Sequence, residues 1–342
     1  PVGDAPVGDE ELHFQRGALC GDGRLDLCKQ VIGPSGIESL MESLALDSVT
    51  RRAVNSVLLG NNIAGNDLGQ AVADMIAGKR VLREEGDGTT RVQPAVKVWY
   101  IAGNRLTADG LRPVLEALQT DDFVTQLWLK RNPLGSSVGV DLASMLQRNT
   151  CLQVLDLTNC ALLDHGLDLL CPGMRANSTL QHLYLGANGI TVVGARKLAQ
   201  VIKEGECNLS GLLLASNRLG DEGVRVLCEA LEQAPKNTIT RLDFSSCGVG
   251  PLGAKHISQL LLSANGCKLR HLGLGFDKTT APLRAVPNRL GAAGVGYLAE
   301  AFRNARPESE LYSVILTHTA GWAADHGAEG RGELGRQAWK KG

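Results

Sequence analysis

A strand-like motif returns along the chain at nearly constant spacing, and it constrains the fold more than any other feature. Its clearest copy is Leu127-Trp128-Leu129, with Asn132 three residues after the second leucine. Asparagine or cysteine fills this last position at steps of 28, 28, 28, 29 and 30 residues, at Asn104, Asn132, Cys160, Asn188, Asn217 and Cys247. Such regular spacing predicts a stack of equal units in which each unit packs only on its neighbours.

Each unit is predicted to be a short strand followed by a helix. Two leucines spaced two apart share one face of a strand. Ten and fourteen residues after the Asn/Cys position stand apolar residues spaced four apart, which is one helix face. These pairs are Leu40 and Leu44, Val114 and Leu118, Leu142 and Leu146, Leu170 and Met174, Leu198 and Ile202, Leu227 and Leu231, and Ile257 and Leu261. Most units also carry a glycine six residues after that position, which is expected to let the helix start close to its neighbour.

The Asn/Cys position is expected to be structural. An asparagine at the end of a strand can satisfy backbone groups that the turn would otherwise bury unpaired. A cysteine suits the same small buried slot, so Cys160 and Cys247 are interpreted as structural thiols.

This pattern resembles the leucine-rich-repeat family, in its ribonuclease-inhibitor-like class. The motif LxxLxLxxN/CxL followed by a helix matches from about Leu25 to Phe302. The resemblance implies an α/β horseshoe solenoid of about 9–10 repeats, with a parallel β-sheet on the concave face and α-helices on the convex face. We expect an N-terminal cap or extension over residues 1–24, the solenoid over 25–319, and a C-terminal cap or tail over 320–342.

The pattern is irregular at three places. The second repeat fits two registers, one with Val57, Leu59, Asn62, Val72 and Ile76, the other with Leu58, Asn61, Ile63, Ala71 and Met75. An insertion near residues 79–94 is expected to be an exposed loop or an extended helix end. A second insertion, near 278–287, follows Asp277 in the asparagine position, and the repeat resumes at Asn288. A last strand is expected over Leu311–Thr317.

Composition narrows the class of function. The net charge is −1, so the basic excess of a typical nucleic-acid binder is missing and no nucleic-acid partner is expected. Nine cysteines without a CxxC pair favour a reducing, cytoplasmic location. No apolar run is long enough to predict a membrane span. No metal-ligand spacing is present, and His182 and His271, which share a repeat position, are three repeats apart. We therefore expect no metal and no cofactor.

The candidate site is the exposed side of the strands. The position four residues before each Asn/Cys should face solvent, because its neighbours are the buried leucines. Three of the eight Trp and Tyr residues fall on it. Exposed aromatic rings beside charges are typical of interface hot spots. The predicted protein-binding residues are Tyr100, Trp128, Lys130, Arg131, Asp156, Tyr184 and Asp243.

The sequence therefore predicts a non-enzymatic interaction module or scaffold that binds a protein on its concave face, either alone or as a subunit of a larger assembly. The resemblance leaves two alternatives. One is a GTPase activator of the Ran-activating type, in which Arg105 or Arg131 would assist phosphoryl transfer. The other is the sensor or effector repeat domain of an immune or bacterial system.

Overall fold

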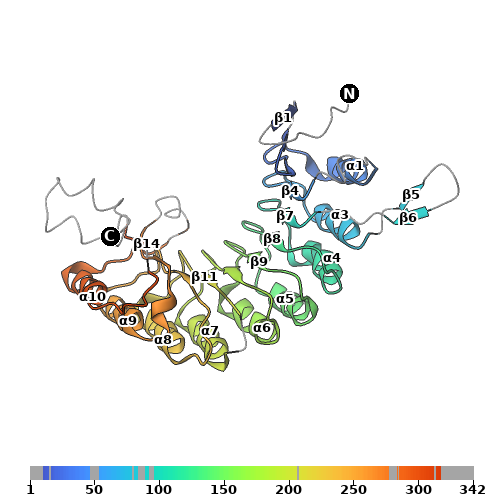
Figure 1. Cartoon of the computed structure of the whole chain (residues 1–342). Coiled ribbons are helices and arrows are strands. Elements are labelled where there is room, and N and C mark those ends of the chain that lie inside the picture. The colour runs from blue at the N-terminus through green and yellow to red at the C-terminus, as the bar shows by residue number, and fades with distance from the viewer. Residues whose placement is uncertain are drawn as a thin grey trace. The chain divides into compact units, whose positions relative to one another are not determined.

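The computed structural model describes residues 11–14, 17–46, 54–78, 81–83, 89–91, 96–205, 208–276, 283, 285–311 and 313–316. The chain divides into two compact units, Pro1–Cys160 and Ala161–Gly342. In each unit the repeat strands form a sheet, and helices cover one of its faces (Figure 1). We call the other face, which carries no helix in the described part of the chain, the open face.

In unit 1 the first described strands pair antiparallel and the later ones pair parallel. Strands β1 and β2 pair antiparallel, as do β2 and β3, whereas β3, β4, β7, β8 and β9 pair parallel in that order. The elements are β1 (Glu11–Phe14), β2 (Gly17–Cys20), β3 (Arg24–Asp26), α1 (Gly33–Leu46), β4 (Ser56–Leu58), α3 (Asp67–Ile76), β5 (Val81–Arg83), β6 (Thr89–Arg91), β7 (Val98–Tyr100), α4 (Ala108–Leu118), β8 (Gln126–Trp128), α5 (Val138–Arg148) and β9 (Val154–Asp156).

Unit 2 repeats the same alternation, and its strands β10 to β14 pair parallel in chain order. Its elements are α6 (Leu163–Ala176), β10 (His182–Tyr184), α7 (Val192–Glu204), β11 (Gly211–Leu213), α8 (Gly220–Gln233), β12 (Arg241–Asp243), α9 (Pro251–Leu262), the 3-10 helix η1 (Gly266–Lys268), β13 (His271–Gly273), α10 (Gly291–Arg303) and β14 (Ser313–Ile315). No helix in the described residues is long and apolar enough to cross a membrane.

The leucine positions of the motif align in register across each sheet, which explains why the units stack. In unit 1 the aligned residues are Leu25, Val57, Trp99, Leu127 and Leu155. All but Leu25 have no exposed surface, and Leu25 is 8 % exposed. A single strand–helix unit cannot bury this apolar stripe alone, so burial of each copy depends on the next one. Each unit is therefore an α/β solenoid of leucine-rich repeats.

The structure selects the first of the two registers for the second repeat. Asn62 is fully buried and its Oδ1 accepts the N–H of Gln30 at 2.9 Å, while its Nδ2 donates to the carbonyl oxygens of Leu27 and Leu59. Ile63, a core residue of the other register, is 42 % exposed. The two registers differ by one residue, and the cross-repeat hydrogen bonds of Asn62 together with the exposure of Ile63 distinguish them.

The structure adds detail to both insertions. Within 79–94 the described residues form an antiparallel hairpin of β5 and β6, not a loop or a helix end. In the second insertion Val286 forms an isolated parallel bridge to Cys247, and Asn288 then occupies the asparagine slot. Asp277, which was expected in that slot, lies outside the described residues, as does the tail 320–342. The last strand spans only Ser313–Ile315 of the expected Leu311–Thr317.

Two helix positions were predicted wrongly. In α1 the buried face is formed by Ile37, Met41 and Leu44, whereas Leu40 is partly exposed. In α10, Leu298 is buried, but Phe302, the expected end of the pattern, is 38 % exposed. Both helices belong to outer repeats, where the sequence period is least constrained by neighbours on both sides.

Candidate functional site

The buried asparagines connect each repeat to its neighbour. Asn104 has no exposed surface, and its Oδ1 accepts the N–H groups of Asn62 at 3.0 Å and Ala64 at 3.4 Å. Its Nδ2 donates to the carbonyl oxygens of Leu59, Ile101 and Ala102 at 2.8, 3.1 and 3.2 Å. Asn132 and Asn217 make the same kinds of bonds, and Asn188 donates to the carbonyl oxygens of its own turn. These side chains hold the fold and are not available to a ligand.

The two cysteines of the same position lie in equivalent buried slots. The Cys160 Sγ donates to the Leu129 carbonyl oxygen at 3.4 Å, and the Cys247 Sγ donates to that of Leu214 at 3.2 Å. Burial raises the pKa of the Cys160 thiol to about 12 and also raises the pKa of Cys247. A thiol that stays protonated at neutral pH is a poor nucleophile, so neither residue suits covalent chemistry.

Two aromatic rings lie side by side on the open face of unit 1. The ring centroids of Tyr100 and Trp128 are 6.3 Å apart with an interplanar angle of 40°. The Tyr100 ring leans over Gly60 beside the Cys28 sulfur, since a Cβ at Gly60 would overlap it. The Trp128 Nε1 donates to the Gln126 Oε1 at 3.1 Å. Both rings are half-buried, so each keeps a face for a contact from outside.

Basic side chains surround the end of this aromatic pair. Lys130 is partly exposed and Arg131 is exposed, at the turn that follows β8. Arg131 adopts a left-handed φ of 61°, as does Arg105 in the preceding repeat with 63°. Neither arginine, nor Lys130, forms an ion pair with another described residue. These cations are therefore available to an acidic group.

Asp156 differs from the expectation of an exposed carboxylate. It is 3 % exposed, and its Oδ1 accepts the N–H of Thr158 at 2.8 Å. Burial raises the pKa of this carboxyl above its usual range, while the Thr158 hydrogen bond and Lys130 act in the opposite direction. Asp156 occupies the predicted strand position, but its carboxylate bonds the backbone of its own turn and is not exposed.

The raised pKa of Asp156 predicts the direction in which Asp156→Asn changes the stability of the fold. A folded-state pKa above the unfolded value stabilises the fold at low pH, and that contribution is lost as pH rises through the raised pKa. The amide keeps an oxygen for the Thr158 N–H but cannot ionise. We expect a modestly higher melting temperature than wild type at pH 7, and a difference that shrinks toward pH 3.8, the ordinary value for this carboxyl. A lower melting temperature at pH 7 would contradict this assignment.

The two remaining predicted residues lie on the open face of unit 2. Tyr184 is half-buried on β10, and Asp243 is half-buried on β12. The Asp243 Oδ1 accepts the N–H of Ser245 at 2.8 Å, and its carboxylate lies over Gly273, where a Cβ would overlap it. The register partner of both residues on β11 is Leu213, and Gly273 lies beyond Asp243 on β13, so these positions lack the paired rings seen in unit 1.

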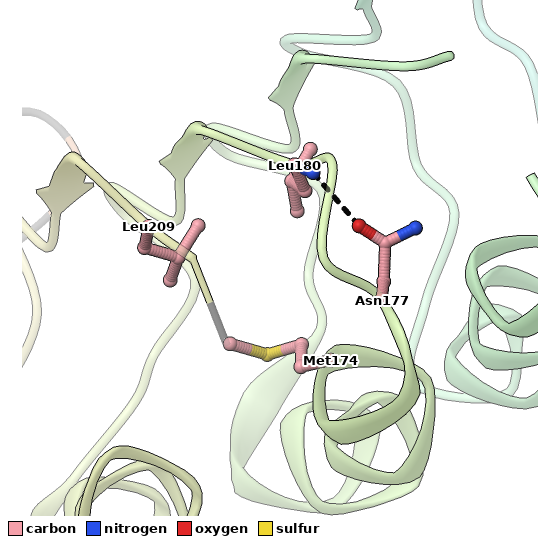
Figure 2. Close-up of a pocket in the computed structure, with 4 residues that line it drawn as sticks. All are labelled: Met174, Asn177, Leu180 and Leu209. Atoms are coloured by element: carbon pink, nitrogen blue, oxygen red, sulfur yellow. Dashed lines mark hydrogen bonds between the residues drawn. The ribbon is translucent and has the colours of Figure 1, made fainter. Parts of the chain in front are cut away.

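Figure 2 shows a small internal void lined by Met174, Asn177, Leu180 and Leu209. Three of its four lining side chains are apolar, and Asn177 Oδ1 accepts the N–H of Leu180 at 2.7 Å. It is a packing void between the C-terminal end of α6 and the segments that lead into β10 and β11, and its lining has no groups for acid–base chemistry. Among the described residues, no group of three or more His, Cys, Asp or Glu side chains is placed to hold a metal ion.

Two sets of structural polar residues were missed by the sequence reasoning. One set closes the loops after α5 and α6, as Asn149 does when its Oδ1 accepts the N–H groups of Cys151 and Leu152 and Asn177 does for Thr179 and Leu180. Its sequence signal is the recurring Asn-Ser/Thr-x-Leu at Asn149 and Asn177.

The other set caps the helix of the following repeat. Asp164 accepts the N–H groups of Thr191 at 2.8 Å and Gly194 at 2.9 Å, and Asp221 accepts that of Gly250 at 2.6 Å. A Cβ at Gly194 would lie less than 3.0 Å from the Asp164 carboxylate. At Gly194 and Gly253 the recurring glycine is therefore needed because a carboxylate from the preceding repeat, Asp164 or Asp221, sits against it.

Comparison with known proteins gives relatives of the same architecture. A family model described as Leucine Rich repeat matches residues 148–171, 176–199, 207–228 and 236–258. Human NACHT, LRR and PYD domains-containing protein 5 is 30 % identical over 282 residues, covering 65 % of this chain and 22 % of that protein. The ribonuclease inhibitor of Sus scrofa is 34 % identical over 201 residues, covering 58 % of this chain and 40 % of the inhibitor.

A third relative is NACHT, LRR and PYD domains-containing protein 12 of Mus musculus. It is 29 % identical over 282 residues, covering 82 % of this chain and 24 % of that protein. The chain thus spans less than half the length of each of these three relatives.

Proposed function

Because this chain is a leucine-rich-repeat protein of the ribonuclease-inhibitor-like class, built as a protein-interaction repeat module, we propose that it binds a protein partner through the open face of unit 1. The contact centres on Tyr100 and Trp128, with Lys130 and Arg131 at its edge. The observation that carries the proposal is the pair of partly exposed rings on a sheet face that no described helix covers.

The aromatic pair has the properties of an interface anchor. Large rings fixed by their neighbours lose little conformational entropy on binding and bury much apolar area. Tyr100 is fixed by Gly60 beneath it, and Trp128 by its hydrogen bond to Gln126. The rings are therefore preorganised, which lowers the cost of binding.

The charges beside the rings favour an acidic partner surface. Lys130 and Arg131 are joined along the same edge by Arg105, whereas the carboxylate predicted beside them, Asp156, is buried. Charge complementarity of this kind contributes mainly to specificity and association rate. The described cysteines are not joined to one another by disulfide bonds, which supports action in a reducing compartment such as the cytoplasm.

Trp128→Ala should abolish capture of the partner in a pull-down from native lysate read by quantitative mass spectrometry. Truncation of a central aromatic anchor costs about 2 kcal/mol or more, which is roughly a thirtyfold loss of affinity. Because Trp128 is only half-buried, circular dichroism should show an intact fold.

The matched control is Phe302→Ala, which removes an exposed aromatic ring from α10 in the other unit. Proteins retained by wild type and Phe302→Ala but lost with Trp128→Ala would be the partners of this surface. The same set of proteins recovered with all three would overturn the proposal. The variants Tyr184→Ala and Asp243→Ala, tested separately, show whether the open face of unit 2 also contributes to partner binding.

A further inference from the structure

The first residues of the strands in unit 2 form a row that the proposed function does not use. His182, Gly211, Arg241 and His271 are register partners on β10, β11, β12 and β13. Each precedes a buried leucine, so the side chains of the row lie on the open face. Neighbouring strands are about 4.8 Å apart, so adjacent side chains of this row are within reach of one another.

The His182 imidazole lies across the glycine of this row. A Cβ at Gly211 would lie less than 3.0 Å from its Nδ1. That nitrogen is buried and has no hydrogen-bond partner among the described residues. Nε2 is therefore the ring nitrogen left to donate to a ligand. Because Gly211 has no side chain, the imidazole can lie across β11, on the side of Arg241.

Positive charge in this row is not balanced by the surrounding carboxylates. Arg241 is exposed and forms no ion pair with another described residue. Its register partner on β13 is His271, which supplies no carboxylate. Of the acidic groups around it, Glu310 is paired with Arg270 at 2.6 Å, and Asp243 leans over Gly273 toward Ser245. A bound anion would neutralise this arginine and accept hydrogen bonds from its guanidinium.

We propose that this row binds a phosphate-type oxyanion, with the Arg241 guanidinium at the centre and the His182 and His271 imidazoles on either side. The planar guanidinium matches two phosphate oxygens at once, and the His182 imidazole can supply a further N–H. The ligand is a phosphate monoester on a bound polypeptide or a free phosphate ion, which share this chemistry.

The electrostatics of the two histidines agree with this geometry. Burial lowers the pKa of His182, and the charge of Arg241 lowers it further. The pKa of His271 is lowered by burial, by Arg241 and by Arg270. An anion on Arg241 would offset this repulsion and raise both values, so binding should strengthen as pH falls through the histidine range.

The test is a pH titration of the histidine imidazoles by NMR, with and without inorganic phosphate at constant ionic strength. His182→Gln and His271→Gln assign the two signals. Phosphate should raise the pKa of both histidines. Arg241→Gln should weaken phosphate binding by about tenfold or more, as expected for loss of a charged hydrogen-bond donor.

The matched control is Arg218→Gln, an exposed arginine of the same unit outside the row, which should bind phosphate like wild type. A phosphoserine peptide and its unphosphorylated form separate the two sources of the ligand: tighter binding of the phosphopeptide than of free phosphate identifies a modified protein. Unchanged histidine pKa values with both probes, or equal binding by Arg241→Gln and wild type, would overturn the proposal. The row around Arg241 lies in unit 2 and shares no residue with the aromatic pair of unit 1. The outcome of the phosphate experiment is therefore independent of the outcome of the Trp128→Ala experiment.

Discussion

Replacing Asn104 with alanine should lower the free energy of unfolding by about 3–5 kcal/mol. The side chain is fully buried and bonds backbone groups of two successive repeats. Its removal leaves the N–H groups of Asn62 and Ala64 without their acceptor, in a place that water does not reach. The carbonyl oxygens of Leu59 and Ile101 each lose one donor and keep a second, from Asn62 and Asn132. Each unsatisfied buried group costs about 1–3 kcal/mol, and these costs fall on one turn.

Urea denaturation followed by circular dichroism and tryptophan fluorescence would measure this loss, because Trp99 is buried in the adjacent strand. The control is Asn304→Ala, an exposed residue after α10, which should change stability by less than about 0.5 kcal/mol. Asn104→Cys should fall between the two, since a thiol occupies this slot at Cys160 and still donates to a carbonyl oxygen. Equal stability of Asn104→Ala and Asn304→Ala would show that the hydrogen bonds across repeats contribute little.

The second large effect is expected for Gly69→Ala. Gly69 is buried in α3, and a Cβ there would lie less than 3.0 Å from the backbone oxygen of Gly110 in α4. Backbone cannot rotate away as a flexible side chain can, so the two helices would have to separate. We expect a loss of about 2–4 kcal/mol, of the size seen when a close-packed core is overfilled.

Gly296→Ala is the matched control for this substitution. It is also a helical glycine, in α10, but a Cβ there would meet no atom within 4 Å. Because alanine favours a helix over glycine by up to about 1 kcal/mol, this variant should be slightly more stable than wild type. Opposite signs for the two variants in the same denaturation experiment would show that helix contact, not helix propensity, requires glycine at position 69. A stabilised Gly69→Ala would contradict the packing argument.

The candidate site was predictable in position but not in accessibility. Tyr100 and Trp128 are placed on the open face by the alternation along a strand, which depends only on which residues are buried leucines. Whether a side chain on that face is exposed depends on its own contacts. Asp156 occupies the same ladder position as Trp128, yet it folds onto the N–H of Thr158 and is almost fully buried.

The same distinction applies to the row around Arg241. The sequence showed that His182 and His271 share a repeat position, and their separation of three repeats excluded a common metal. It did not indicate that Gly211 leaves room for the His182 ring, or that the carboxylates nearby are engaged elsewhere. These facts depend on side-chain conformations that no periodic pattern encodes.

The sequence by itself determined the repeating strand–helix alternation and the buried asparagine positions, because one short period recurs and identical units can stack in only one phase. The tertiary structure decided the register of Asn62, the return of the chain to Asn288 after an insertion, and the hairpin of β5 and β6. It also explained the glycines at 194 and 253 through a carboxylate of the preceding repeat. The reason is common to all of these: each depends on atoms from two different repeats, whereas the sequence period describes only one repeat at a time.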